Sequence, residues 1–286
     1  MAEVATFARS DQLLVVIDPI ARRTDGESVR IAKDVLSAGA TTKVCLPEDG
    51  DEFARALVRR GARRPVVIGD DGALLRAVSL LHRQRQLAEC VLSVVPVGGA
   101  LSLAASLGVP LGAVAAARAA LDGAERRLDL LVDDSDGVVL GGLRIPPVRD
   151  PADPAGATAP GPGPGRPWLR TCQSLVRTLV PARGTPAAAS AGPSRLRIEV
   201  DGDTLIDLDE PVDAVSVTPG APGIAAVEVH RVSVGAAAAP LRAEGRTVTV
   251  SGAHFRYRAD ASVSGPVRRR TWTVVEGALR LVLPGR

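Results

Sequence analysis

Two glycine-rich turns carry the residues of this chain best suited to chemistry. Residues 69–72 (Gly-Asp-Asp-Gly) follow the apolar run 66–68 and precede a helical pattern, and residues 96–99 (Pro-Val-Gly-Gly) follow the next apolar run. Glycine lets a ligand approach the backbone, and the N-terminus of a following helix favours anions. An aspartate there holds Mg²⁺ or accepts a hydroxyl proton. The pattern indicates a phosphate or metal site.

Each turn also has a purely structural interpretation, which the sequence leaves open. A tight strand-to-helix turn uses an aspartate as N-cap and glycine for its backbone freedom. If the two strands are neighbours in a parallel sheet, both turns lie at one edge of it, where ligands bind in open α/β sheets. Asp18-Pro19 ends the first apolar run without a G-x-G-x-x-G motif, which disfavours a hydride-transferring dinucleotide enzyme.

The first half of the chain alternates short apolar runs with helical patterns. This alternation predicts βαβ units and a Rossmann-like parallel sheet, with nearly continuous apolar strands because both faces are covered. The expected strands are 13–17, 42–46, 65–68, 92–95 and 128–132. The expected helices are 25–38, 51–60, one from the turn at 69–72 to about residue 89, 98–107 and 111–121.

The second half changes character and predicts an antiparallel β-sandwich. A hairpin-like turn is expected at 134–137, and the expected strands are 196–200, 204–208, 214–219, 225–234, 246–250, 255–259, 270–275 and 278–284. We therefore predict an α/β domain at residues 1–127 and an all-β domain at 128–286. Linkers rich in Pro, Gly and Ala are expected at 146–167 and 181–194, with a basic amphipathic helix at 168–180 between them.

Composition narrows the classes of function. The formal net charge is only +3 over 286 residues, which argues against a nucleic-acid binder but fits an anionic ligand or membrane surface. Three widely spaced cysteines show no metal spacing, and neither an apolar leader nor a membrane-spanning run appears, so a cytoplasmic location is expected. The three histidines share no ligand spacing, and Arg268–Arg270 is more typical of a solvated strand end than of a lipid or phosphate site.

Taken together, these motifs resemble the diacylglycerol kinase catalytic-domain family, which includes bacterial lipid kinases and sphingosine kinases. The family has N-P after its first strand, G-G-D-G-T after its third, and P-x-G-T-x-N-D-x-A-R-x-L-G-x-P after its fourth. The matching segments here are residues 18–19, 69–73 and 96–110, the last with the same length, and Asp260-Ala261-Ser262 is similar to the family's D-G-E element.

The resemblance implies transfer of a phosphoryl group from ATP to a lipid hydroxyl with Mg²⁺, in a cleft between an α/β nucleotide domain and a β-sandwich. It implies nucleotide and lipid as partners, with room for peripheral contact at an anionic membrane. The implied catalytic residues are Asp71, which would also bind the metal, and Asp260. The implied nucleotide-binding residues are Asp18, Gly69, Asp70, Gly72, Ala73, Gly98, Gly99 and Ser102.

Several of these positions depart from the family pattern, and they motivate a second hypothesis. Asp18 replaces Asn, Asp70 replaces Gly, Ala73 and Gly99 replace Thr, and Ser102 replaces Asp. Each lost charge-assisted hydrogen bond costs about 1.5–3 kcal/mol, so two would weaken nucleotide binding by roughly a hundredfold or more. The alternatives are an impaired lipid kinase and a non-catalytic homologue that binds lipid, nucleotide or protein. An NAD-kinase-like enzyme, which shares the G-G-D-G theme, fits less well.

Overall fold

The computed structural model describes residues 12–146, 193–232 and 239–285. The predicted linkers, the amphipathic helix at 168–180 and Cys172 lie outside these ranges, apart from the end residues of the two linkers. Nothing in the structure tests them, nor the predicted domain boundary.

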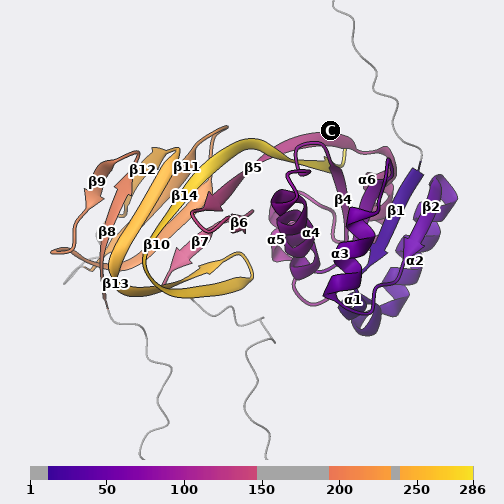
Figure 1. The fold of residues 1–286 in the computed structure, drawn as a ribbon, viewed down its shortest axis with the longest axis horizontal. Coiled ribbons are helices and arrows are strands. Elements are labelled where there is room, and N and C mark those ends of the chain that lie inside the picture. The colour runs from indigo at the N-terminus through magenta and orange to yellow at the C-terminus, as the bar shows by residue number, and fades with distance from the viewer. Residues whose placement is uncertain (1–11, 147–192, 233–238, 286) are drawn as a thin grey trace, which may run out of the picture.

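The N-terminal half alternates strands and helices (Figure 1). Its elements are β1 (Gln12–Ile17), α1 (Pro19–Thr24), α2 (Gly26–Gly39), β2 (Thr41–Cys45), α3 (Gly50–Val58), β3 (Arg64–Gly69), α4 (Asp71–Arg83), β4 (Val91–Pro96), α5 (Ser102–Ser106) and α6 (Ala113–Asp122). The four strands are parallel in the order β4-β3-β1-β2. Their carboxyl ends therefore share one edge, as the sequence predicts for the two glycine turns.

Helices cover both faces of this sheet, and the side chains of β1 show why the apolar runs are continuous. Leu14 and Val16 pack into a core with α3 and α4, whereas Leu13, Val15 and Ile17 pack into a second core with α1, α2 and α6. Alternate residues of a strand point to opposite faces, so a strand buried on both sides needs an apolar residue at every position.

Three helix predictions differ from the structure. α1 was not expected. α4 ends at Arg83, where Arg85 adopts a positive φ of 57°, rather than near residue 89. α5 begins at Ser102 rather than at residue 98, because Gly98 has φ +135° and cannot belong to a right-handed helix. Residues 98–101 are thus a loop, and it lies at the edge that carries the candidate site.

The rest of the described chain consists of strands. They are β5 (Ala124–Asp133), β6 (Val138–Val139), β7 (Leu143–Ile145), β8 (Ser194–Val200), β9 (Asp203–Ile206), β10 (Pro211–Pro219), β11 (Ala225–Arg231), β12 (Leu241–Gly245), β13 (Thr247–Ala259) and β14 (Ser262–Leu283). The chain is thus a mixed α/β N-terminal part followed by a strand-rich C-terminal part. β5 and β6 pair antiparallel across the expected turn at 134–137.

The last strand joins the two parts. Two strands were expected at 270–275 and 278–284, but both belong to β14, which runs antiparallel to β13 and β5 and then parallel to β4 (Figure 1). All strands of the described residues therefore form one fourteen-stranded hydrogen-bonded sheet. Register shifts near Phe255 and before Leu279 mark the positions where the sequence pattern breaks.

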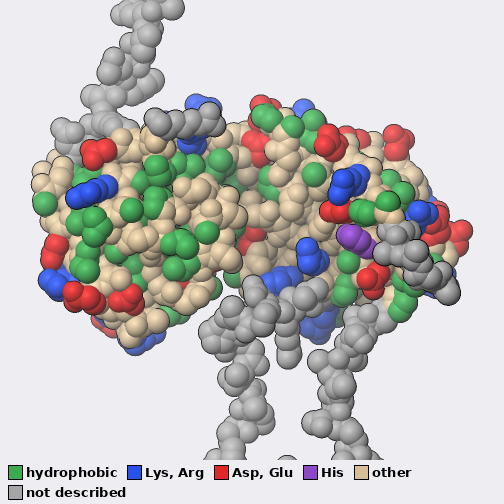
Figure 2. Space-filling model, turned by 180° about the vertical axis from the view of Figure 1, so that it is seen from behind, with side chains coloured by type: hydrophobic (Ala, Val, Ile, Leu, Met, Phe, Trp, Pro, Cys, Tyr) green, Lys and Arg blue, Asp and Glu red, His purple; other side chains and the backbone are tan. Residues whose placement is uncertain are grey.

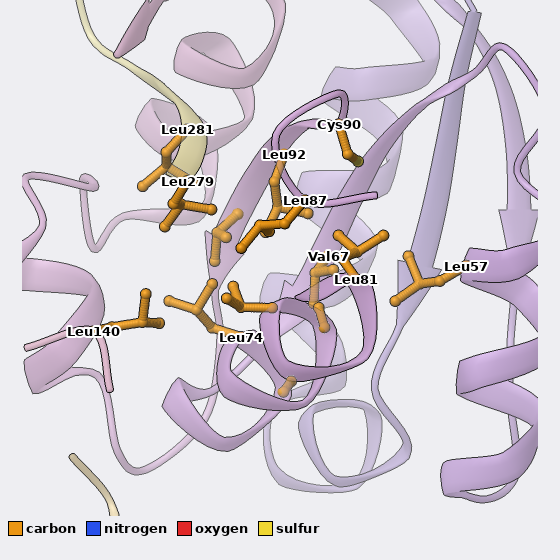
Figure 3. Close-up of a cluster of buried hydrophobic side chains, with 14 of the residues drawn as sticks. Leu57, Val67, Leu74, Leu81, Leu87, Cys90, Leu92, Leu140, Leu279 and Leu281 are labelled. Carbon is orange, nitrogen blue, oxygen red and sulfur yellow. The ribbon is translucent and has the colours of Figure 1, made fainter. Parts of the chain in front are cut away.

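One hydrophobic core receives side chains from both parts of the chain. Leu279 and Leu281 of β14 and Leu140 lie beside Leu74 and Leu92 of the α/β part (Figure 3). Within the described residues, no helix combines the length and apolar character needed to span a membrane.

Candidate functional site

The first glycine turn is held by its own aspartates. Asp70 is the N-cap of α4, and its carboxylate accepts a hydrogen bond from the backbone N–H of Ala73 at 3.0 Å. Asp71 is buried and points the other way. Its carboxylate accepts hydrogen bonds from the backbone N–H groups of Leu103 at 2.8 Å and Ala104 at 2.9 Å, with the Ser102 hydroxyl at 3.4 Å. Asp71 thus fixes the N-terminus of α5, and through it the loop at 98–101.

Asp18 at the end of β1 is also buried and has two partners. One carboxylate oxygen accepts the backbone N–H of Ile20 at 2.8 Å, which caps α1, and the other is paired with the guanidinium of Arg76. Arg76 also lies 5.7 Å from the centre of the Phe53 ring. A cation over an aromatic face and beside a carboxylate is held from two sides. The negative charge of Asp18 is thereby offset where phosphates were expected.

The glycines of the two turns have different environments. A β-carbon on Gly69 would lie 2.5 Å from that of Ala73, and one on Gly98 would lie 3.0 Å from that of Asp70. Gly69 is therefore required by packing within its own turn and against the end of β1, and Gly98 by the contact between the two turns. At Gly99, by contrast, an added β-carbon would meet no atom within 4 Å, so the backbone there is open. Ala73 is wholly buried, which leaves Gly99 and its neighbours as the surface that a phosphate could reach.

Asp260 reaches the same region from the turn between β13 and β14. It has a positive φ of 47°, and its carboxylate accepts backbone N–H groups from Leu140 at 2.7 Å, Gly141 at 2.7 Å and Gly142 at 3.1 Å. A β-carbon on Gly141 would lie 2.9 Å from Leu103 and 3.2 Å from the Asp260 carboxylate. Gly141 therefore lies between Asp260 and the helix that Asp71 caps.

Burial raises the pKa of the Asp260 carboxyl above its ordinary value, and the nearby charge of Asp71 adds to the rise. The three backbone hydrogen bonds act in the opposite direction but do not cancel the loss of hydration. A carboxyl with a raised pKa that lines a groove is a candidate for proton transfer. The two predicted catalytic aspartates thus come together from elements far apart in the sequence.

A groove runs between the two parts of the chain beside these residues. We call it the interdomain groove. Its larger section, of about 360 Å³, is lined from α3, α4 and the β13–β14 turn, including Phe53, Arg76, Arg83 and Ala261. Its smaller section, of about 130 Å³, includes Tyr257 and Asp260. Both sections contain Leu75, Ser79 and Ser262. An apolar wall with arginines, hydroxyls and the carboxylates of Asp133 and Asp260 suits an amphiphilic ligand.

The structure gives different support for the two implied cofactors. The open backbone at Gly99 and the guanidinium of Arg76 fit a phosphate group. Magnesium has no prepared protein cage, because Asp18, Asp71 and Asp260 already accept hydrogen bonds on both carboxylate oxygens. Within the described ranges, no group of three or more His, Cys, Asp or Glu side chains is arranged to hold a metal. A magnesium ion would therefore depend on phosphate oxygens for much of its coordination.

Arg76 lies at the site but is not among the residues predicted from the sequence. It lies four residues after Gly72, so it projects from the same face of α4 as the turn. This spacing in the sequence could have indicated that Arg76 lies near the turn. The pairing of Arg76 with Asp18, however, depends on the β1–β3 register. The remaining candidates have structural partners: His82 Nε2 lies 2.8 Å from Asp136, and Arg270 is paired with Asp134. Cys45 and Cys90 are free cysteines.

Comparison with known families agrees with this geometry. Residues 12–132 match the model of the diacylglycerol kinase catalytic domain. The matched segment contains β1 to β4, both glycine turns and most of β5. These residues are similar to that family's catalytic domain. Asp260 lies outside this matched segment, although it lines the same groove as α4 of the kinase-type domain.

Solved structures extend the likeness of fold beyond the kinase-type domain. A candidate diacylglycerol kinase from Bacillus anthracis str. Sterne aligns with a TM-score of 0.69 at 14% identity, covering 96% of this chain and 98% of that chain. A diacylglycerol kinase structure from the same organism aligns with a TM-score of 0.66 at 12% identity, covering 96% and 98%. At these identities the likeness concerns the fold alone. Among curated proteins, none matches the sequence.

Proposed function

We propose that this protein is a diacylglycerol kinase-like lipid kinase that transfers a phosphoryl group from ATP to a lipid hydroxyl. We further propose that the departures of its two glycine turns from the family pattern make this reaction slow. The observation that carries the proposal is that Arg76 and Asp260 line adjoining sections of the interdomain groove, at the end of the parallel strands that also carries the open backbone of Gly99. A carboxylate with a raised pKa, a cation and an open glycine loop are the parts that a phosphoryl transfer needs.

Asp260 is the proton acceptor in this proposal. Its Oδ1 accepts two backbone N–H groups, whereas Oδ2 accepts only that of Leu140, so Oδ2 has more remaining capacity. As the lipid oxygen forms its bond to phosphorus, its proton passes to Oδ2, and the bond to the leaving diphosphate breaks. ATP supplies the phosphoryl group. Arg76 orients and neutralises phosphate oxygens, and Leu75 and Phe53 contact the acyl side of the acceptor.

Asp71 has a positioning role in this proposal. It is only 2% exposed, and its oxygens are engaged by α5, so it shapes the loop at 98–101 rather than meeting a substrate. Asp70 and Asp18 place two further carboxylates beside the phosphate path, and only Asp18 has an arginine partner. Uncompensated negative charge near phosphates weakens nucleotide binding, which is the reason to expect a slow reaction.

A second candidate function is a non-catalytic homologue that binds nucleotide or lipid. The full hydrogen-bonding of Asp18, Asp71 and Asp260 favours it, because a magnesium-dependent site usually keeps carboxylate oxygens available for the metal or its waters.

One paired experiment separates these two functions. Radiolabelled phosphate transfer to diacylglycerol vesicles is measured beside calorimetry with Mg-ATP, for wild type and Asp260→Asn. Transfer that falls at least tenfold in the variant supports the lipid kinase. Heat without transfer supports the non-catalytic homologue. The absence of both at millimolar nucleotide contradicts a nucleotide-binding function altogether.

A further inference from the structure

A second groove lies at the amino-terminal ends of the parallel strands, opposite the candidate site, and we call it the basic groove. It encloses about 690 Å³, more than the interdomain groove. Its walls are the segment after α3, the starts of β3 and β4, and the ends of β5 and β14 that pair with each other. In Figure 1 this end of the parallel strands is at the top, near the C-terminal end of β14. The candidate site is at the other end of the same strands, about 17 Å away along β3.

Positive charge is concentrated in this groove. It is lined by five arginines and two glutamates, which leaves three more positive than negative charges. The whole chain has a formal net charge of +3. On the rear face shown in Figure 2, by contrast, the two signs are interspersed over the described surface. The arginines are Arg60, Arg63, Arg64, Arg127 and Arg280.

The arginines differ in how they are held. Arg280 forms two hydrogen bonds with Glu125, at 2.6 and 2.8 Å, so this pair is largely neutralised. Arg60 donates to the side-chain oxygen of Gln86 at 2.7 Å, and Arg64 donates to the backbone oxygen of Ala120 at 3.1 Å. Both of these acceptors are uncharged. Gln86 orients the guanidinium of Arg60 and leaves its charge in place.

Arg63 and Arg127 complete the set. Within the described residues, neither has a carboxylate within ion-pair distance. They come from different parts of the chain, Arg63 from the segment after α3 and Arg127 from β5, and both line the same groove. Glu89 and Glu125 offset part of this charge, and Arg127 lies close enough to help lower the pKa of Glu125. The groove nevertheless stays net positive, and an anion bound between the arginines would relieve their mutual repulsion.

We infer that the basic groove binds a phosphate group. Guanidinium groups match the geometry of phosphate oxygens with paired N–H donors, and orientation by neutral acceptors lowers the entropy cost of binding. The volume is large enough for a phosphate together with the molecule that carries it. That molecule is either a free phosphate compound or the headgroup of an anionic lipid. This site is separate from the proposed kinase site, and the inference does not rest on the proposed function.

The test compares two matched double variants of the full chain. Arg63→Gln with Arg127→Gln removes two charges from the groove. Arg118→Gln with Arg256→Gln removes two exposed charges elsewhere, on α6 and β13. Calorimetry with pyrophosphate probes free phosphate. Co-sedimentation with phosphatidylcholine vesicles, with and without phosphatidic acid, probes the lipid headgroup.

We expect wild type to bind at least one probe, the groove variant to bind it about tenfold more weakly, and the control variant to stay within about twofold. Loss confined to pyrophosphate identifies a free phosphate compound, and loss confined to phosphatidic acid vesicles identifies a lipid headgroup. Equal weakening in the control variant, or no binding of either probe by wild type, overturns the inference. Asp260→Asn should leave this binding unchanged even where it abolishes transfer, so failure of one proposal is distinguishable from failure of the other.

Discussion

At the scale of single residues, buried aspartates organise this protein. Asp18, Asp71 and Asp260 each bind backbone N–H groups of a neighbouring turn or helix. A carboxylate that accepts several N–H groups stabilises a turn strongly, because it satisfies donors that burial would otherwise leave unpaired. The aspartates that the family resemblance assigns to catalysis or nucleotide binding therefore also stabilise the turns of the site.

Replacing Asp71 with asparagine should destabilise the fold. The asparagine keeps one oxygen but points an NH₂ group at a backbone N–H of α5, so we expect the free energy of unfolding to fall by about 2–4 kcal/mol. The measurement is urea unfolding. Asp70→Asn is the matched control, because asparagine is an equally good N-cap and should change stability by less than about 1 kcal/mol. Equal effects of the two substitutions would contradict the role assigned to Asp71.

The pH dependence of Asp260 provides a second residue-scale prediction. Its folded-state pKa lies above the ordinary 3.8. The folded state therefore binds the proton more tightly than the unfolded chain does, and this contribution to stability is lost as pH rises through the folded pKa. Urea unfolding measured from pH 3.8 upward should show this decline, and Asp260→Asn should remove it.

The rate of phosphate transfer should also depend on the titration of Asp260, but it should rise with pH where stability falls. A proton acceptor works when deprotonated, so phosphate transfer should rise with pH, and its midpoint should lie above that of an ordinary aspartate. An acid limb centred at or below 3.8 would exclude Asp260 as the acceptor.

At the scale of elements, the two strand-to-helix turns fit each other closely. Gly98 allows this contact, because a β-carbon there would press on Asp70, whereas Gly69 allows close packing against Ala73 within the first turn. Gly99 is one residue further along and faces open space. Adjacent glycines therefore have different roles, one in packing and one at the surface offered to a ligand.

Two alanine substitutions should separate these roles. Gly69→Ala places a β-carbon 2.5 Å from that of Ala73, and overpacking of this kind costs about 1–3 kcal/mol. Gly99→Ala should leave stability within about 0.5 kcal/mol of wild type but weaken Mg-ATP binding severalfold, because the methyl group occupies the approach to the backbone. Urea unfolding and calorimetry measure the two effects. Unchanged nucleotide affinity in a stable Gly99→Ala variant would rule out this loop as the phosphate surface.

At the scale of the whole molecule, β14 makes the two parts interdependent. It pairs with β4 and β5, and it delivers Leu279 and Leu281 to the core of the α/β part (Figure 3). The kinase-type domain therefore lacks part of its core when β14 is absent. This interdependence also fixes the position of Asp260, because the turn that carries it leads directly into β14.

Truncation of a β14 side chain should accordingly destabilise both parts at once. Leu281→Ala should lower the free energy of unfolding by about 2–5 kcal/mol, the usual cost of emptying a buried leucine site. We expect a single unfolding transition when far-UV circular dichroism and tryptophan fluorescence are compared. Val275→Ala is the control, since Val275 is 40% exposed on the same strand and should cost much less. Two separate transitions would show that the parts unfold independently.

Features that depend on neighbouring residues could be predicted from the amino-acid sequence. Alternating apolar runs and helical patterns identified β1 to β4 with small shifts at their ends, and the parallel order places both glycine turns at one edge. The helix predicted from residue 98 was wrong, because the backbone of Gly98 is set by its contact with Asp70 rather than by local preference. β13 and β14 were each predicted as two strands, since bulges interrupt the alternation without ending the hydrogen bonding.

The contacts between distant side chains, by contrast, could be learned only from the folded chain. Asp71 faces α5, Arg76 binds Asp18, and Asp260 approaches across some 190 residues of chain; none of these contacts follows from spacing. The basic groove is likewise assembled from four distant segments. The physical reason is that backbone preference and apolar periodicity are local, whereas hydrogen bonds of buried carboxylates and the gathering of like charges depend on which segments packing brings together.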